Sequence, residues 1–429
     1  MRVALIDTPA PQLWEDKLEP NLGLLYLATF LKVNNHEVKL IDLRGITKDK
    51  WEHQLKIENI EKFDLCGFST YTPTFNITLE ILKLVKEMNE NIISVAGGPH
   101  ATALPKEVKN YFDYVIRNEG EIALLELVNK IEYGKAPRKK IIEGKPIMNL
   151  DDLPFPDYSL CDIFKYKRHI YGKKCLSILS SRGCPYSCRF CNSIILGAGK
   201  IPRFRSPENI VREITMLKEN YHVEAFRFND DLFTMNYPRL KKINELLKLL
   251  DIIYRCFGRV NHCSKKVAEI LANGGCKHIS FGVESGSQKI LDLMNKQQTI
   301  KDIKEGIKNA KKAGLIVRAY LIVGFPGETW ETVKETVNLM LECMPDEIEV
   351  YNFIPYPGTY VFNYPEKFGI TFIDRDWSKY WQTIGDKDSG YVFRTKYLNE
   401  ETIKNMRFFI IEKLLSNGIK WAGESKKFK

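Results

Sequence analysis

The first 130 residues alternate between short apolar runs and longer segments with helical periodicity. Five apolar runs predict strands, at residues 3–6, 38–41, 65–69, 92–96 and 115–116. Three intervening segments have the apolar spacing of helices, at residues 22–31, 76–88 and 121–131. Strands separated by helices predict a parallel, doubly wound α/β sheet. Ligands of such sheets bind beyond the carboxyl ends of the strands, so we expect a binding site among the loops there.

The alternation resumes with longer helices between about residues 175 and 355. Six strands are predicted, at residues 175–181, 225–228, 252–259, 278–283, 317–323 and 347–354. One of the helices starts with Ser206 as its N-cap and Pro207 in its first turn, and its apolar residues share one face. Six β/α units predict an open partial barrel of the TIM type, with the chemistry at the C-terminal ends of its strands.

The segments around the two sheets complete the expected organisation. Residues 136–172 read as a linker, because Pro154 and Pro156 interrupt any helix or central strand there. Residues 361–429 combine aromatic residues and loops with an amphipathic helix near 402–415, and we expect them to form a small α-rich region that caps the site. The α/β domain then spans residues 1–135 and the partial barrel residues 173–360.

Composition and charge narrow the class of protein. Apolar residues make up 44% of the 429 residues and charged residues 28%, as in ordinary globular proteins. The longest apolar run, residues 22–31, is shorter than the roughly 18 residues of a membrane span, and the N-terminus lacks a signal-peptide core. We therefore expect a cytoplasmic protein. The net charge of +10 comes from lysines scattered along helices, so we do not expect a nucleic-acid partner.

Three of the ten cysteines are clustered as C-x3-C-x2-C directly after the first predicted strand of the barrel. Thiolates at Cys184, Cys188 and Cys191 can hold three corners of a [4Fe–4S] cluster. Because no fourth cysteine lies nearby, one iron stays open for an exogenous ligand. The alternative is a structural zinc site, but no histidine or second cysteine pair follows within about thirty residues.

The triplet, its place after the first strand and the later acidic and glycine-rich segments resemble radical S-adenosylmethionine (radical SAM) enzymes of the cobalamin-binding subgroup. The resemblance covers about residues 1–360. It implies that the open iron chelates SAM, and that an electron from the cluster cleaves SAM to methionine and a 5′-deoxyadenosyl radical. The implied cofactors are a [4Fe–4S] cluster, SAM and cobalamin, and the implied partner is a reductant such as flavodoxin or ferredoxin.

The same resemblance implies a set of SAM-binding residues at the ends of the barrel strands. Acids after the second strand would face the SAM amino group, and the segment after the fourth strand its ribose. Two cations would face its carboxylate, and backbone after the last two strands its adenine. The implied set is Asn229, Asp230, Asp231, Arg259, Glu284, Ser285, Lys296, Gly324 and Ile354. An Asx turn at 229–231 and a solvated Lys296 are the alternatives.

Four loops of the first domain resemble the family's cobalamin-binding segments. Their glycines would let backbone approach the macrocycle. The implied set is Leu24, Ser69, Thr70, Tyr71, Thr72, Gly97, Gly98, Pro99, His100, Glu119 and Gly120. No D-x-H-x-x-G motif is present, which implies a cobalt without protein histidine ligation and Tyr71 or Thr72 near its lower face. A domain that binds no corrin, and His100 as an axial ligand, are alternatives.

The pairing of these two domains favours radical methylation of an unactivated carbon in a small molecule or natural-product intermediate. Relatives that cyclise or rearrange their substrates use the same parts. A tRNA methylthiotransferase would carry further cluster cysteines in its first domain, where only Cys66 occurs. A corrinoid- or iron-sensing protein without catalysis is the remaining alternative.

Overall fold

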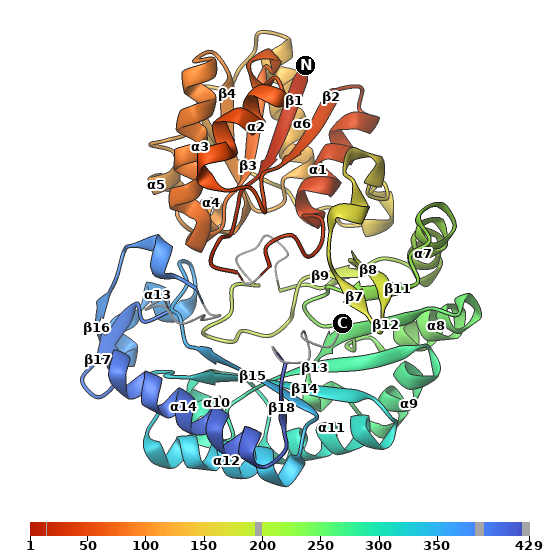
Figure 1. Ribbon diagram of the computed structural model, residues 1–429, viewed down its shortest axis with the longest axis vertical. Helices are drawn as coiled ribbons and strands as arrows, with labels where there is room; N and C mark the ends of the chain where they lie inside the picture. Colours follow the sequence, from red (N-terminus) through yellow and green to blue (C-terminus); the bar gives the residue numbers. More distant parts are fainter. Residues whose placement is uncertain (14, 194–199, 382–389, 423–429) are drawn as a thin grey trace.

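The computed structural model describes residues 1–13, 15–193, 200–381 and 390–422. Two α/β bodies lie one above the other, with the N-terminal sheet in the upper body and the larger, curled sheet in the lower one (Figure 1).

The N-terminal sheet has the strand order β2-β1-β3-β4-β5-β6, and all of its pairs are parallel. Its strands are β1 (Arg2–Asp7), β2 (Glu37–Asp42), β3 (Leu65–Ser69), β4 (Ile93–Gly97), β5 (Tyr114–Arg117) and β6 (Ile141–Glu143). Val3 and Leu5 of β1 pack on one face, whereas Ala4 and Ile6 pack on the other. Both faces are therefore covered, as a parallel sheet requires.

Six helices cover these two faces. On the Val3 side lie α1 (Leu22–Val33) and α6 (Glu121–Glu132). The other helices are α2 (Trp51–Ile57), α3 (Phe75–Met88), α4 (Gly98–Ala103) and α5 (Pro105–Val108), whose apolar residues join the core on the opposite side. The expected doubly wound α/β domain is confirmed.

The second sheet curls into a half barrel with the order β18-β15-β14-β13-β12-β11-β8-β7. Its six central strands are mutually parallel: β8 (Lys173–Ile178), β11 (Ala225–Phe228), β12 (Ile253–Gly258), β13 (Cys276–Glu284), β14 (Ile316–Val323) and β15 (Glu347–Asn352). The edge strands are β7 (His169–Ile170) and β18 (Lys420–Trp421). The expected partial barrel is confirmed.

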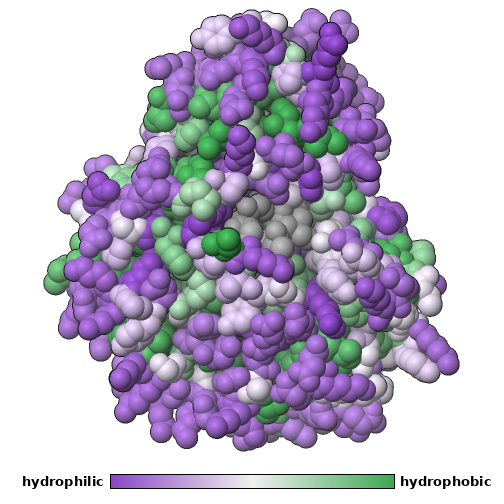
Figure 2. Space-filling view, turned by 180° about the vertical axis from the view of Figure 1, so that it is seen from behind, coloured by the Kyte–Doolittle hydropathy of each residue, from purple (hydrophilic) through white to green (hydrophobic). Residues whose placement is uncertain are grey.

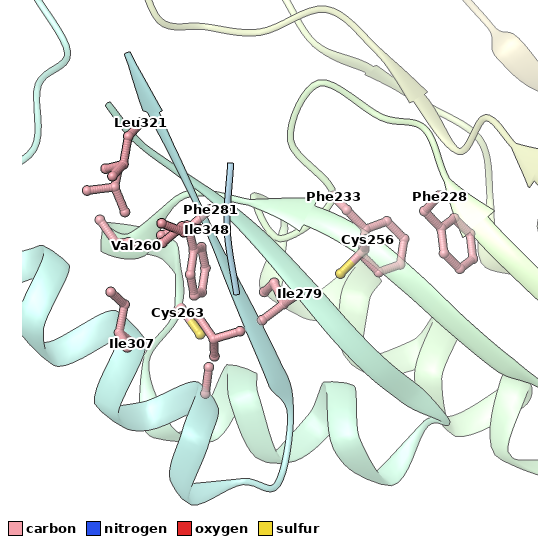
Figure 3. Packing of buried hydrophobic residues seen from close by; sticks show 14 of the residues in the cluster. Phe228, Phe233, Cys256, Val260, Cys263, Ile279, Phe281, Ile307, Leu321 and Ile348 are labelled. Carbon is pink, nitrogen blue, oxygen red and sulfur yellow. The ribbon is translucent and has the colours of Figure 1, made fainter. Parts of the chain in front are cut away.

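Helices follow the barrel strands and cover the outer face of the sheet. They are α7 (Pro207–Tyr221), α8 (Tyr237–Leu247), α9 (Lys265–Asn273), α10 (Gln288–Leu293), α11 (Ile300–Lys312) and α12 (Trp330–Cys343). Alternate strand residues such as Phe228, Ile279 and Ile348 form the core on this outer side (Figure 3). The residues between them face the concave side of the sheet.

The structure corrects two strand expectations. The strand expected at 175–181 is broken, because β8 ends at Ile178 and the short β9 (Ser181–Arg182) pairs with β10 (Arg203–Phe204) instead. β6 lies within the expected linker, where it pairs with the free edge of β5. A three-residue edge strand carries too little hydrophobic pattern to be recognised from sequence.

The C-terminal region contains the helix expected near residues 402–415, together with short strands that were not expected. It contains α13 (Tyr360–Asn363), a hairpin of β16 (Ile370–Ile373) and β17 (Phe393–Thr395), the long helix α14 (Glu400–Ser416), and β18. Trp377 and Tyr380 join the apolar core of the N-terminal domain, and Trp377 Nε1 donates to Glu107 Oε1 at 2.8 Å. The C-terminal region thus ties the barrel to the first domain.

Hydrophilic residues cover most of the face seen from behind, with smaller hydrophobic patches between them (Figure 2). In the part of the chain that the structure describes, no helix is both long and apolar enough for a membrane span.

Candidate cofactor site between the two domains

The three clustered cysteines lie on the loop that follows β9. All three thiols are free of disulfides, and Cys188 is 9% exposed. Burial raises the pKa of the Cys184 and Cys191 thiols, and the charges of Cys188 and Asp231 raise the pKa of both further. Each thiol therefore lies close to the other two. The spacing in the sequence has produced one thiol-lined loop.

A cation lies against this loop. The Arg259 guanidinium is 3.7 Å from Cys188 Sγ, stands 3.6 Å from the centre of the Tyr186 ring, and donates to the Lys296 carbonyl. A positive charge at this position compensates the negative charge of thiolate ligands. Because a cubane attaches each cysteine to a different iron, its thiolates lie farther apart than the ligands of a single ion. Within the described ranges, no group of three or more His, Cys, Asp or Glu side chains is arranged around one metal ion. Three free thiols on one loop, with a cation beside Cys188, fit the three protein ligands of such a cluster.

The acids after β11 have different surroundings. Asp230 is 2% exposed and accepts hydrogen bonds from Ser180 N at 2.7 Å, Ser180 Oγ at 2.5 Å and Ser181 Oγ at 2.6 Å. Asp231 is exposed and accepts from Ser193 Oγ at 2.8 Å, beside Cys191. Asp230 therefore anchors the approach to the cluster loop, and Asp231 is available to a ligand.

The predicted ribose and carboxylate residues contact each other. Lys296 Nζ lies 2.6 Å from Glu284 Oε1, and both residues are less than a tenth exposed. A Cβ at Gly282 would lie 2.4 Å from Glu284 Oε1, so only glycine leaves room for this pair. Ser285 is fully buried, and its Oγ lies 3.3 Å from Thr336 Oγ1.

The two adenine candidates lie at the ends of β14 and β15. Gly324 adopts φ +86°, and its amide donates to the buried Glu328 carboxyl, whose pKa burial raises to about 8. Ile354 is 2% exposed and packs into the core that the first domain shares with the C-terminal region. The Ile354 side chain is therefore committed to packing, and only its backbone remains for a ligand.

A cavity with a volume of about 360 Å³, partly open to solvent, lies between the N-terminal domain and the barrel. Its barrel side includes Ser181, Arg182, Asn229 and Asp231. Its other walls include many predicted cobalamin residues, which are Leu24, Ser69, Tyr71, Gly97, Gly98, Pro99, Glu119 and Gly120. Five glycines line it in total, so backbone forms much of its wall, as a bulky flat ring requires.

Three predicted cobalamin residues are not brought to this cavity, namely Thr70, Thr72 and His100. His100 is fully buried, with its Nδ1 3.1 Å from Thr72 Oγ1 and its ring 4.2 Å from that of Phe75. Burial lowers the pKa of this imidazole to about 3. His100 is thus a locally bonded core histidine, and the structure gives no support to an axial-ligand role.

Sequence reasoning missed the charge network that joins the two domains at this cavity. Glu119 pairs with Arg203 and lies 3.3 Å from Arg182, and Arg182 lies 2.7 Å from Glu121. The acids come from the first domain and the arginines from β9 and β10. No sequence signal identifies such partners, because they lie about sixty to eighty residues apart.

A second cavity adjoins the first, and Asn21, Tyr71 and Asn229 line both. It reaches Glu19 and Ser177 at the concave face of the barrel and Trp381 of the C-terminal region. The two cavities together connect the first domain with the barrel, at Ser177 and at Asp231, which contacts Ser193 beside the cluster loop.

Comparison with known families agrees with this geometry. Residues 178–340 match the model of the radical SAM superfamily, and residues 17–128 match the model of the B12 binding domain. The first match contains the cysteine loop, and the second contains most of the first cavity's glycine wall.

Individual proteins are similar to this chain over most of its length. The uncharacterized methyltransferase PH0819 of Pyrococcus horikoshii is 34% identical over 408 residues, covering 90% of this chain and 86% of that protein. The anaerobic magnesium-protoporphyrin IX monomethyl ester cyclase of Rubrivivax gelatinosus is 29% identical, covering 80% and 66%. The structure of the radical SAM methyltransferase TsrM from Kitasatospora setae, with cobalamin and a [4Fe–4S] cluster bound, has a TM-score of 0.72 at 15% identity and covers 97% of this chain and 88% of its own. The chain therefore belongs to the radical SAM superfamily, in the group that carries an N-terminal B12-binding domain, and its cofactors are a [4Fe–4S] cluster, SAM and cobalamin.

Proposed function

We propose that this protein is a cobalamin-dependent radical SAM methyltransferase that transfers a methyl group from SAM to a carbon atom of a small molecule. The observation that carries the proposal is the cavity shared by the two domains, where Asn229 and Asp231 of the barrel face the glycine-lined wall of the first domain. Two relatives named as methyltransferases, PH0819 and TsrM, support it.

We assign cobalamin binding to residues 1–135, SAM chemistry to residues 173–360 and capping of the site to residues 361–429. Cys184, Cys188 and Cys191 would hold the cluster, and the first cavity would hold cobalamin. When bound, the cluster supplies the electron that cleaves SAM, and cobalamin carries the methyl group.

The residues of the chain position these groups. Arg259 offsets negative charge at Cys188, and Asp231 presents a carboxylate that suits an ammonium group. Lys296 uses one of its three N–H donors on Glu284, so the others remain for a carboxylate. Because Glu284 orients the lysine, the pair is arranged before the ligand arrives.

The second cavity would admit the substrate from the side opposite the cobalamin wall. It borders Asn229 and Tyr71, which also line the first cavity, so a molecule in it adjoins both cofactor regions. We further propose that a small electron carrier such as flavodoxin or ferredoxin reduces the cluster.

The test is an anaerobic assay of the protein reconstituted with iron, sulfide and cobalamin, and reduced by flavodoxin. Metabolite extract from the source cell is supplied with SAM that carries a deuterated methyl group. We expect a product with a labelled methyl group, formed together with 5′-deoxyadenosine, and loss of both in Cys188→Ala. Products that form with 5′-deoxyadenosine but never carry the label would replace the proposal with a cyclase or rearrangement activity.

A further inference from the structure

The concave face of the half barrel carries an unusual number of charged side chains. Arg227, Arg255, Arg318, Glu347 and Glu349 alternate with residues whose side chains pack under the outer helices. Because helices cover the outer face, solvent reaches these strand residues only from the concave side. At these positions the concave face of the barrel is therefore polar.

Most of these charges are paired. Glu19 lies 2.5 Å from Arg227 and 3.2 Å from Arg168, and its pKa is lowered because the attraction of these arginines outweighs burial. Arg318 lies 2.5 Å from Glu347 and 3.3 Å from Glu349. These two clusters hold three cations and three anions, so together they are neutral.

Arg255 is the exception. Its side chain is partly exposed, and it makes no hydrogen bond or ion pair with any residue that the structure describes; its Nε is buried without a partner. Burial and the like charges of Arg318 and Arg227 lower its pKa. His278, the register partner of Arg255, is neutral near pH 7, because burial lowers its pKa to about 4, and it cannot act as a counter-ion. Among the described residues, the concave face therefore carries one arginine, Arg255, without an ion-pair partner.

A guanidinium without a counter-ion in such a place is costly, because desolvation and repulsion are not offset. Among the described residues, the favourable contact that Arg255 does make is with the Phe257 ring, whose centre lies 5.9 Å from the guanidinium, and that contact supplies no negative charge. An incoming anion would supply the missing charge and accept bidentate hydrogen bonds from the planar guanidinium.

Aromatic rings lie between Arg255 and the cluster loop. The rings of Phe257 and Tyr320 stack with centroids 6.2 Å apart, and those of Tyr320 and Tyr351 at 5.7 Å. Residues 255 and 257 are successive inward positions of β12, and Arg259 directly follows this strand, so Arg255 lies about 13 Å along the chain direction from Arg259. Arg259 contacts the cluster loop. The second cavity reaches Ser177, the register partner of Arg227, and Arg227 is in turn the register partner of Arg255.

We propose that Arg255 binds an acidic group of the substrate, a carboxylate or a phosphate, while the Phe257–Tyr320–Tyr351 ladder contacts the apolar body of the same molecule. The reacting end of the substrate then points toward the cluster loop. This inference rests on the proposed function, since it assigns the substrate class of that site.

The test measures binding of three aromatic probes to the anaerobic, cluster-reconstituted and SAM-loaded protein. The probes are 2-naphthoate, 2-naphthyl phosphate and uncharged 2-naphthylmethanol. We expect an anionic probe to bind at least about tenfold more tightly than the alcohol, because charge-assisted hydrogen bonds are strong where water is scarce. Preference for naphthoate identifies a carboxylate, and preference for the phosphate ester identifies a phosphate.

Two variants locate the site. Arg255→Met keeps the length of the side chain and should bind all three probes alike, whereas Arg255→Lys should keep part of the preference. Arg255→Met should unfold at the same or a higher temperature than the wild type, because it removes an unpaired charge, whereas a structural arginine would lower that temperature. The matched control, Arg394→Met on the exposed face of the β16–β17 hairpin, should leave the preference unchanged.

Equal binding of charged and uncharged probes by the wild type would overturn the proposal, as would an anion preference that survives in Arg255→Met. The probe-binding measurements do not depend on whether the protein transfers a methyl group. A protein that prefers anions through Arg255 but transfers no label would refute the proposed function and leave the binding site standing.

Discussion

Replacing Asp230 tests how the cluster loop is held in place. The Asp230 carboxylate accepts three hydrogen bonds from Ser180 and Ser181, and the nearby Arg239 adds a favourable charge. Asp230→Ala would leave buried donors without an acceptor, at about 1–3 kcal/mol each, and would remove the counter-charge of Arg239. Since the surrounding backbone can relax in part, we expect a total loss of about 3–5 kcal/mol in the free energy of unfolding, the range for breaking a buried pair.

The assay is thermal unfolding of the anaerobically purified protein, followed by circular dichroism. A loss of that size corresponds to a fall in melting temperature of roughly 6–20 °C for a domain of the barrel's size. Asp230→Asn keeps one acceptor oxygen, so its melting temperature should lie between those of the wild type and Asp230→Ala. Asp231→Ala is the matched control, because the Asp231 carboxylate is exposed. This substitution should change the melting temperature little while weakening SAM binding. If Asp230→Ala melts within about 2 °C of the wild type, or Asp231→Ala loses as much, the assignment of the two roles is wrong.

Three further changes have defined outcomes. Cys188→Ala should lower the iron content and the visible absorbance of the reconstituted protein, whereas Cys343→Ala, on an outer helix, should leave both unchanged. Gly98→Ala should lower stability by about 1–2 kcal/mol and weaken cobalamin binding, measured by spectral titration, because Gly98 has φ +90° and a Cβ there would lie 3.0 Å from Thr70 backbone atoms. Glu328 keeps its proton when folded, since its pKa is raised from 4.5 to about 8, so stability should fall as pH rises from about 4.5 to 8. Glu328→Gln should remove that slope, which is at most about 1.4 kcal/mol per pH unit.

Each of these expectations has an outcome that contradicts it. Full iron content in Cys188→Ala would show that this thiol is not a ligand of the cluster. Unchanged cobalamin affinity in Gly98→Ala would place the corrin elsewhere. Urea unfolding midpoints that depend on pH identically in wild type and Glu328→Gln would show that this carboxyl is not protonated in the folded protein.

The pattern of hydrophobic residues along the sequence predicted most of the fold. Periods of two and 3.6 identified the central strands of both sheets, because those strands are buried on defined faces and their helices are long. The pattern failed where elements were short or held by non-local bonds. Asp230 breaks the strand before the cluster loop from fifty residues away, and no local signal reports that contact.

The site was predictable where chemistry depends on spacing along the chain, and unpredictable where it depends on partners across it. The Cys184–Cys191 loop could be read directly, since its three ligands lie within eight residues and need only one turn of backbone. The tertiary structure decided that Lys296 pairs with Glu284, and that His100 turns into the core. It also left Arg255 unpaired. The register between parallel strands and the packing of one domain on another determine which charges meet, and neither is written in the order of residues along a single strand.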